Sequence, residues 1–347
     1  MSSQVQIAII GAGVSGLAAA HTLLDAGYTV TLFEKDQQVG GRANTRSRAG
    51  FIYDPGAQHI KRGDASSVRL ITERFRTPEL IDISKPVWIF NAQGKIEEGD
   101  PRQNAEPKWS YRSGLRALSL RMAVDLTIHL QTPITHIRQG SAGNLSLYTS
   151  DGAHVGDFAR LLLAIPPNEA LSLMQQSSFA QEIGPAICSY LTRARYNPLL
   201  SVMLGYRPRP ALRPYYALVN PDKGHPISWL AWEHEKAPER APQDSGLLIA
   251  QMAPPYSTEH LNASDQELLH DVAQRVATLI DEPLPAPCFT DIVRWPLALP
   301  AATADAHGLN ALTLPYGLAF CGDGYVGGRL HLAIEHGIMV ARQLASK

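Results

Sequence analysis

The chain has 347 residues, of which 45% are hydrophobic, and this length is sufficient for two domains of ordinary globular composition. Its 31 basic residues balance 32 acidic ones, and neither sign forms a long run. The charge pattern therefore gives no footprint for nucleic acid or for an anionic membrane surface. We expect a small-molecule partner, with no nucleic acid and no membrane, and the sequence does not indicate an oligomeric state.

The cysteines and the start of the chain indicate the compartment. Residues 1–4 leave no room for a charged segment before the first apolar run, so we expect a cytoplasmic protein. Cys188, Cys288 and Cys321 are far apart and form no CxxC pair, which argues against a disulfide framework or a zinc site. We predict buried free thiols and no metal.

A glycine-rich turn follows the first apolar run. Residues 5–10 read as a strand, and a helix-like run that ends near Ala26 follows the GAGVSG segment. In the dinucleotide-binding fingerprint, Gly11 permits the tight turn, Gly13 lets a pyrophosphate approach the backbone, and Gly16 lets helix and strand pack closely. The alternative is a tight turn that binds nothing. The matching context on both sides favours a dinucleotide site.

The residues after this turn extend the fingerprint. Val14 and Ser15 open the helix, whose N-terminal amides and dipole attract a phosphate. Glu34 closes the next strand-like run, at the spacing of an acid that accepts hydrogen bonds from the adenosine ribose. Because a carboxylate there would repel a 2′-phosphate, FAD or NAD is favoured over NADP.

Two loops come next. Gly40 and Gly41 precede Arg42, whose guanidinium could reach a second phosphate with a bidentate fork, although a plain turn is the alternative. Residues 53–59 form a second loop by their proline and glycine.

The middle of the chain predicts a return to the first domain and then a second domain. Residues 80–109 look polar and irregular, helical spacing resumes at 115–122, and residues 161–165 read as a buried central parallel strand. Residues 168–288 contain many prolines and aromatic residues and are predicted to form the second domain. Short strands are also predicted at 126–130, 134–137 and 145–149. A helix is predicted to begin at a capping box at Ser264–Glu267 and to end before Pro283, with an apolar stripe at Leu268, Val272, Val276 and Leu279.

A second strand-to-glycine-to-helix junction lies near the C-terminus. Residues 318–321 read as a strand before Gly322 and Asp323, and Arg329 opens a helix that runs to about Leu344. Asp323 could accept hydrogen bonds from ribityl hydroxyls or order the pyrophosphate loop, or it could merely cap the turn. The helix N-terminus could stabilise negative charge at flavin N1 and C2 carbonyl.

Two histidines, His59 and His331, follow these cofactor-type loops. We take both as candidate catalytic residues facing the ring, with a structural role as the alternative for each.

Together these residues resemble the flavin amine oxidase superfamily, and within it the bacterial renalase-like branch. The superfamily pattern comprises GxGxxG, a terminal Glu, GGR, a DxGA-type loop and a C-terminal GD before a helix. The resemblance to the branch is carried by Gly56, Ala57, Gln58, Trp109, Gly114–Leu118, Trp229–Ala231, Lys236, Pro238–Arg240, Arg294, Trp295, Pro300, Cys321–Asp323, Gly328–Leu330 and Ala333.

The resemblance implies an α/β fold, with a discontinuous Rossmann-like FAD-binding domain and a second α+β substrate domain built on a mixed sheet. The implied FAD-binding domain comprises 1–80, 110–167 and 289–347, and the substrate domain comprises 81–109 and 168–288. The implied cofactor contacts are Gly11, Gly13, Val14, Ser15, Gly16, Glu34, Lys35, Gly41, Arg42, Gly56, Ala57, Gln58, Ile134, Gly322, Asp323, Arg329 and Leu330, and the implied substrate-pocket residues are Tyr196, Trp229 and Trp295.

The same resemblance implies an enzyme with noncovalent FAD that oxidises misreduced 2- or 6-dihydronicotinamide isomers of NAD(P)H. Hydride passes to flavin N5, and dioxygen accepts the electrons to give hydrogen peroxide. Departures from the branch occur at His59 and Ile60, at Trp232–His234 and at His331 and Leu332. The alternatives are an amine oxidase or desaturase, an aromatic hydroxylase, an NAD-dependent dehydrogenase, and an FAD-binding protein without catalysis.

Overall fold

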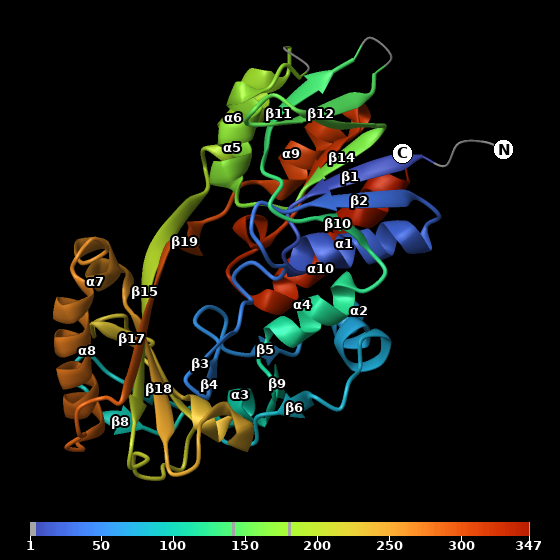
Figure 1. The fold of residues 1–347 in the computed structure, drawn as a ribbon. Coiled ribbons are helices and arrows are strands. Elements are labelled where there is room, and N and C mark those ends of the chain that lie inside the picture. The colour runs from blue at the N-terminus through green and yellow to red at the C-terminus, as the bar shows by residue number, and fades with distance from the viewer. Residues whose placement is uncertain (1–4, 141–142, 180–181, 347) are drawn as a thin grey trace.

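The computed structural model describes residues 5–140, 143–179 and 182–346, and its first component is a parallel sheet. Every pair of neighbouring strands in this sheet runs parallel, and Figure 1 shows β1 between β14 and β2. Strand β20 pairs with the other edge of β14, so β14 is an inner strand. The prediction of a central parallel strand at 161–165 is therefore confirmed. In spatial order the strands are β10 (Thr127–His129), β2 (Thr29–Phe33), β1 (Gln6–Ile10), β14 (Arg160–Leu163) and β20 (Leu318–Phe320).

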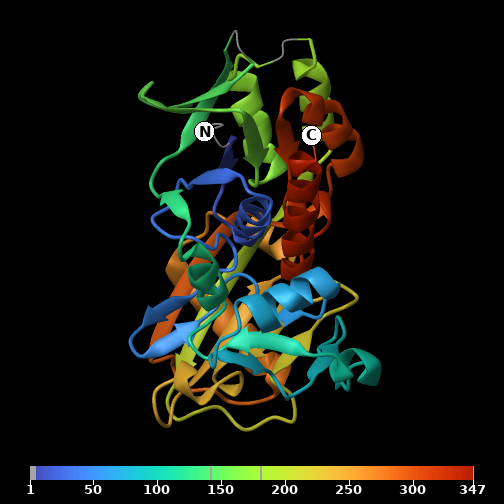
Figure 2. The same ribbon diagram turned by 90° about the vertical axis from the view of Figure 1, so that its right-hand side faces the viewer.

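Helices cover both faces of the parallel sheet, because alternate strand residues point to opposite faces. Ile7 and Ile9 pack in one core with α1 and α10, and Ala8 and Ile10 pack in a second core on the other face. Figure 2 shows α10 lying beside α1. The first face carries α1 (Val14–Asp25), α4 (Arg116–Ala123) and α10 (Leu330–Ala345), and the second carries α5 (Pro167–Gln176), α6 (Gly184–Leu191) and α9 (Ala306–Thr313).

The second large component is a mixed seven-stranded sheet. Its neighbouring strands are antiparallel except β16 and β7, which pair in parallel. The α/β fold with a second, mixed-sheet part is therefore confirmed. In spatial order the strands are β19 (Phe289–Ala302), β15 (Arg195–Tyr206), β18 (Gly246–Met252), β17 (Ile227–Trp232), β16 (Ala217–Val219), β7 (Val87–Phe90) and β8 (Ile96–Glu97).

Helix α8 (Asp265–Ile280) covers one face of the mixed sheet. It begins at the predicted capping box, in which the Ser264 side chain accepts from the Glu267 backbone N–H. Its apolar stripe packs in one core with strand residues such as Val202. The helix ends before Pro283, because Asp281 adopts the left-handed conformation with φ of 49°. The short helix α7 (Pro254–Glu259) packs against β15.

The remaining secondary structure of the described residues comprises three small sheets, two short α-helices and 3-10 turns at Glu233–Glu235, Pro238–Arg240, Leu314–Tyr316 and Asp323–Tyr325. Of these, β5 contacts both β9 and the start of α10, so it lies near the C-terminal junction. The elements are β3 (Arg46–Arg48) with β4 (Phe51–Tyr53); β5 (Ile60–Lys61), β9 (Lys108–Tyr111) and β6 (Leu80–Asp82); β11 (Ile134–Gln139), β12 (Leu145–Thr149) and β13 (His154–Phe158); α2 (Ala65–Arg69), extended by a π-helical turn at Leu70–Arg74; and α3 (Pro101–Ala105).

Several predictions require correction. The segment 80–109, predicted as irregular, contains β7, whose partner β16 lies far along the chain and cannot be inferred locally. Residues 289–302, which the sequence analysis grouped with the cofactor domain, pair with β15 in the mixed sheet. Conversely, α5 and α6 pack on the parallel sheet, although 168–288 was grouped with the substrate domain.

The cysteines also differ from expectation. Cys321 is buried, but Cys188 is half-buried and Cys288 is exposed, so the prediction of buried thiols holds for Cys321 alone. Within the described ranges, no helix is long and apolar enough to cross a membrane.

Candidate active site

The glycine turn after β1 has room for a ligand at one position. Gly11 has φ of 101°, and a Cβ there would lie 2.8 Å from the Ala164 carbonyl oxygen. A Cβ on Gly16 would lie 2.1 Å from the Gly11 carbonyl oxygen. A Cβ on Gly13, at the N-terminus of α1, would meet no atom within 4 Å. The outer two glycines are therefore required for packing, whereas Gly13 borders open space, as a pyrophosphate site requires.

Glu34 lies against this turn. Its Oε2 accepts a hydrogen bond from the Ala12 backbone N–H at 2.8 Å, and its Oε1 accepts one from Asp36 at 3.0 Å. Burial raises the pKa of the carboxyl, although both backbone hydrogen bonds favour the charged form. The two hydrogen bonds fix the carboxylate in place and leave other lone pairs for hydroxyl donors.

Lys35 and Ile134, two further predicted cofactor contacts, lie near Glu34 but differ in orientation. The Lys35 ammonium forms an ion pair with Glu169 at 2.8 Å, so its side chain is directed toward α5. Ile134 is half-buried and follows Thr132, whose N–H donates to the Glu34 carbonyl oxygen at 2.8 Å. The segment that carries Ile134 is therefore held next to Glu34 through Thr132, whereas the Lys35 side chain pairs with Glu169.

Arg42, Asp323 and Tyr196 form a polar group between the two sheets. The guanidinium donates to Asp323 Oδ1 at 2.7 Å and lies 5.3 Å from the centre of the Tyr196 ring. The Tyr196 hydroxyl donates to the same Asp323 oxygen at 3.3 Å. Burial works against the charge on Arg42, but Asp323 and Tyr196 outweigh it and raise the pKa of Arg42. Arg42 also donates to the carbonyl oxygens of Leu297 at 3.2 Å and Ala298 at 3.0 Å.

The two nucleotide-type junctions meet at this point. The Gly40 N–H donates to the Ala12 carbonyl oxygen at 3.0 Å, which holds the loop before Arg42 on the first turn. Gly322 has φ of 129°, and a Cβ there would meet no atom within 4 Å. The Ser15 hydroxyl of α1 donates to Cys321 Sγ, directly after β20, at 3.1 Å. These contacts hold the two turns together, and each turn contains one glycine, Gly13 or Gly322, at which a Cβ would meet no atom within 4 Å.

The loop from Asp54 to Gln58 is fixed by hydrogen bonds from several segments. Asp54 Oδ1 accepts from the Thr45 hydroxyl at 2.6 Å and from the Leu115 N–H at 2.9 Å. Gln58 Nε2 donates back to the Asp54 carbonyl oxygen at 2.5 Å. Trp295 Nε1 donates to the Pro55 carbonyl oxygen at 3.2 Å, and Gln251 Nε2 donates to that of Gly56 at 2.7 Å. Trp295 therefore supports the loop that carries Gly56, Ala57 and Gln58.

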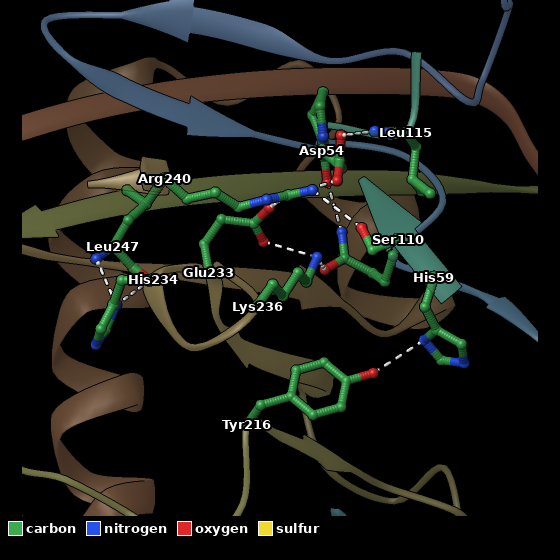
Figure 3. Close-up of polar contacts among 12 residues, drawn as sticks. Asp54, His59, Ser110, Leu115, Tyr216, Glu233, His234, Lys236, Arg240 and Leu247 are labelled. Atoms are coloured by element: carbon green, nitrogen blue, oxygen red, sulfur yellow. Dashed lines mark hydrogen bonds and ion pairs between the residues drawn. The ribbon is translucent and has the colours of Figure 1, made fainter. Parts of the chain in front are cut away.

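A buried cluster of four charged side chains lies under this loop (Figure 3). Asp54, Glu233, Lys236 and Arg240 point toward one another, and each side chain is 0% exposed. Lys236 Nζ lies 2.7 Å from Glu233 Oε2, and Arg240 Nη1 donates to Asp54 Oδ2 at 2.7 Å and to Glu233. Two cations balance two carboxylates, so the cluster is formally neutral. We call these four residues the buried charge cluster.

The buried charge cluster contacts the candidate site through Gln58. Lys236 Nζ donates to Gln58 Oε1 at 3.2 Å, and Arg240 Nη2 donates to the Ser110 hydroxyl at 3.0 Å. Burial lowers the pKa of Lys236, and Glu233 acts against that shift. None of these four residues was among the site residues predicted from the sequence. A usable signal was present, because Glu233, Lys236 and Arg240 fall between two strongly apolar strands, where charged residues are buried only when paired.

His59 is the predicted catalytic residue with the clearest setting. Its Nδ1 and the Tyr216 hydroxyl share a hydrogen bond of 3.0 Å, and its ring centre lies 5.8 Å from that of Trp229. Burial, followed by the charge of Lys236, lowers the pKa of His59 to about 3. His59 is therefore neutral at neutral pH, and its Nδ1 is engaged by the Tyr216 hydroxyl.

The other predicted residues are placed less centrally. His331 lies in the first turn of α10, where its ring would be 3.0 Å from a Cβ on Gly63, and burial lowers its pKa. Arg329 is the exposed N-cap residue of α10, and Leu330 is half-buried beside it. The structure thus brings His59 and Trp229 together, and places Tyr196 with Arg42 and Asp323.

A glycine turn of this geometry on a parallel sheet, with a mixed sheet beside it, defines a dinucleotide-binding protein of two-sheet architecture. A family model, "Flavin containing amine oxidoreductase", matches residues 14–111 and 80–345. The chain belongs to this family. Its cofactor is FAD, and its class is that of the FAD-dependent oxidoreductases.

Curated relatives match over short stretches. A 4,4′-diapophytoene desaturase of Staphylococcus haemolyticus is 38% identical over 85 residues, 24% of this chain and 17% of the relative. One from Staphylococcus aureus is 52% identical over 52 residues, 15% of this chain and 10% of the relative. The chain therefore aligns with less than a fifth of the length of these desaturases.

Solved structures match over the whole chain. A putative protoporphyrinogen oxidase from Exiguobacterium has a TM-score of 0.79 at 18% identity, covering 100% of this chain and 99% of its own. Cyclohexylamine oxidase from Brevibacterium oxydans has a TM-score of 0.76 at 16% identity, covering 99% of each chain. At such identities the likeness shows the fold alone.

Proposed function

We propose that this chain is a renalase-type oxidase that takes a hydride from 2- or 6-dihydro isomers of NAD(P)H, with dioxygen as the electron acceptor. The observation that carries the proposal is the setting of His59, which is neutral, half-buried and in contact with Tyr216 and Trp229. Loss of hydride from a dihydropyridine produces an aromatic cation without removal of a proton, so this reaction requires no general base. A site built from aromatic rings and a neutral imidazole can perform it by orientation alone.

The residues around the glycine turn fit noncovalent FAD. Gly13 and the N-terminus of α1 would hold the pyrophosphate, and Glu34 would accept hydrogen bonds from the adenosine ribose. Asp323, held by Arg42 and Tyr196, would accept hydrogen bonds from the ribityl chain. When bound, FAD accepts the hydride and delivers two electrons to dioxygen, which becomes hydrogen peroxide.

In this proposal the aromatic residues position the donor ring. Trp229 offers an apolar face, and His59 Nε2 offers one polar contact to a ring substituent. Tyr216 fixes the plane of the imidazole through its hydroxyl. The loop that carries His59 is in turn held by the buried charge cluster through Gln58.

Anaerobic mixing tests the proposal. The FAD-loaded protein is mixed with 2-, 4- or 6-dihydro-NAD(P)H, and the visible absorbance of the oxidised flavin is followed by stopped flow. We expect rapid bleaching with the 2- or 6-dihydro isomers, little with the 4-dihydro form, and hydrogen peroxide on admission of air. Absence of bleaching with every isomer would exclude the renalase-type reaction.

An amine oxidase or desaturase is the second candidate, favoured by the family and by the desaturase relatives. Cyclohexylamine and a linear diamine are added to the same anaerobic assay. Flavin reduction by an amine, increasing as pH rises and the amine loses its proton, would support that candidate. An FAD-binding role without catalysis would give bound flavin that none of these donors reduces.

A further inference from the structure

Two lysines face each other beside the candidate site. Lys61 of β5 and Lys108 of β9 are direct partners in an antiparallel pair. Opposite residues of such a pair have side chains on the same face, with Cβ atoms roughly 5 Å apart, and like charges there are destabilising. The protein therefore keeps an unfavourable pair of cations next to His59, which directly precedes β5.

The residues around this pair compensate for little of its charge. Lys108 is buried, and its Nζ donates to the carbonyl oxygens of Asn104 at 3.0 Å and Glu106 at 3.4 Å, not to a carboxylate. Asp82 attracts Lys108, but its carboxylate accepts from the backbone N–H of Lys108 at 2.8 Å. Lys61 is half-buried and forms no ion pair within the described ranges.

A third cation extends the pair. Arg329 is the exposed N-cap residue of α10, and α10 contacts β5. The first turn of α10 holds no acidic residue, so its positive helix end is not neutralised there. Burial, followed by the charges of Arg329 and Lys108, lowers the pKa of Lys61, as expected for cations that repel one another.

We propose that Lys61, Lys108 and Arg329 form a binding site for an anionic oxygen group, a phosphate or a carboxylate, carried by the substrate whose ring lies against His59. This inference deepens the proposed function and rests on it for the identity of the ring. An anion between the cations turns an unfavourable pair into charge-assisted hydrogen bonds. The same cations repel a substrate with an ammonium group, so the site selects against amines of low molecular weight at neutral pH.

The proposed anion site is separate from the place expected for the cofactor pyrophosphate. A Cβ on Gly337 would lie 2.2 Å from the Ser15 carbonyl oxygen, which fixes where α10 crosses the glycine turn. Arg329 precedes Gly337 along the chain by about two helical turns, so it lies roughly 12 Å away along the axis of α10. The cations at β5 therefore remain available to a second ligand.

The test measures binding of ligands that cannot react. Nicotinamide mononucleotide and nicotinamide riboside differ by one phosphate, and nicotinate and nicotinamide differ by one carboxylate. Each is titrated into the FAD-loaded protein and followed by the flavin difference spectrum. We expect the phosphate or the carboxylate to tighten binding by about tenfold or more, and the pair that shows the gain identifies the anion.

Substitutions of the proposed cations test which residues bind the anionic group. Lys61→Met and Arg329→Met should each weaken binding of the ligand with the anionic group by about tenfold, and should not weaken binding of its partner without that group. Lys95→Met is the matched control, because Lys95 is exposed and pairs with Glu97 on the β7–β8 hairpin. Equal affinities within both ligand pairs would overturn the proposal. Loss of FAD from Lys61→Met or Arg329→Met would also overturn it, because the cations would then serve the cofactor.

Failure of the proposed function is distinguishable from failure of the anion site. Inorganic phosphate requires no ring contact, and its binding is measured by calorimetry on the wild type and on Lys61→Met. Phosphate binding that weakens in Lys61→Met supports the site even where no dihydronicotinamide reduces the flavin. Turnover of dihydronicotinamides without any effect of Lys61→Met on phosphate or ligand binding overturns the anion site alone.

Discussion

Gly16 and Gly11 approach so closely that a Cβ on Gly16 would lie 2.1 Å from the Gly11 carbonyl oxygen. This contact brings the first turn of α1 against the end of β1. At Gly13, by contrast, a Cβ would meet no atom within 4 Å, so packing does not require glycine at that position.

Gly13→Ala should therefore reduce FAD affinity while the apoprotein keeps its stability. Gly13 has φ of −72°, which alanine adopts without strain, so the free energy of unfolding should change by less than about 0.5 kcal/mol. FAD affinity, measured by fluorescence titration of the apoprotein, should fall at least about tenfold, because the methyl group occupies the phosphate position. Gly16→Ala is the comparison and should destabilise the apoprotein by about 1–3 kcal/mol. Unchanged FAD affinity in Gly13→Ala would contradict the assignment.

Glu34→Ala should weaken FAD retention. The substitution removes the acceptor held by Ala12 and Asp36 and leaves the ribose hydroxyls without a partner. Loss of hydrogen bonds to a charged group corresponds to roughly tenfold or more in affinity. Flavin content after gel filtration measures the effect, with Glu259→Ala as a control at a carboxylate that is 77% exposed. Equal occupancy in the two variants would disprove the ribose assignment.

Lys236→Met should destabilise the protein strongly. Removal of one cation leaves the buried charge cluster with two carboxylates and one guanidinium, each 0% exposed. Breaking a buried ion pair in this way costs about 3–5 kcal/mol, which urea unfolding of the FAD-loaded protein measures. The double variant Lys236→Met with Glu233→Gln should recover part of the loss, because the two changes share one contact.

Lys35→Met is the matched control for Lys236. Lys35 also pairs with a glutamate, Glu169, at 2.8 Å, but its side chain is 52% exposed. Exposed pairs contribute about 0–1 kcal/mol. A similar loss of stability in Lys35→Met and Lys236→Met would show that burial of the charges is irrelevant.

Stability should fall as pH decreases below the ordinary pKa of histidine. Burial lowers the pKa of His234 and of His336 to about 4, from 6.5. The unfolded chain therefore binds more protons between these values, so the folded state loses stability as pH falls through that window and keeps it above about 6.5. At about pH 5 the loss is about 2 kcal/mol for each histidine.

His336→Gln tests this pH dependence. The Gly322 N–H donates to His336 Nδ1 at 3.2 Å, and a glutamine oxygen can accept the same hydrogen bond without titrating. Urea unfolding between about pH 7 and pH 5 should show a shallower decline in the variant, by about one histidine. His154, an exposed histidine, supplies the control through His154→Gln. If the free energy of unfolding declines equally with falling pH in the wild type and in His336→Gln, His336 does not cause this pH dependence.

The segments that could be predicted from sequence are those whose contacts are local. The run from β1 through Gly11 and Gly16 to α1 is fixed by neighbours in the chain, and the capping box at Ser264 acts within one turn. Strand β7 was missed because it becomes a strand only by pairing with β16, which the intervening chain separates from it. Its local polar and proline-rich flanks gave no periodicity to detect.

The candidate site likewise has a part that could be predicted from sequence and a part that could not. The open position at Gly13 and the carboxylate of Glu34 follow from one continuous motif. The buried charge cluster joins Asp54 to residues 233–240, and 186 positions separate Asp54 from Arg240 along the chain. Pattern reasoning can flag charges between apolar strands, but only the three-dimensional arrangement pairs them.

Strands β15 and β19 have a mechanical consequence for the molecule. They form a long two-stranded ribbon that runs from the parallel sheet into the mixed sheet (Figure 1). The pairing is irregular at Arg195/Tyr196 and again between Asn197 and Leu199, and such interruptions are where a ribbon bends. Tyr196 lies at this interruption of the strand pairing, and its hydroxyl donates to Asp323. A change in the angle of this bend would therefore move the hydroxyl that contacts Asp323.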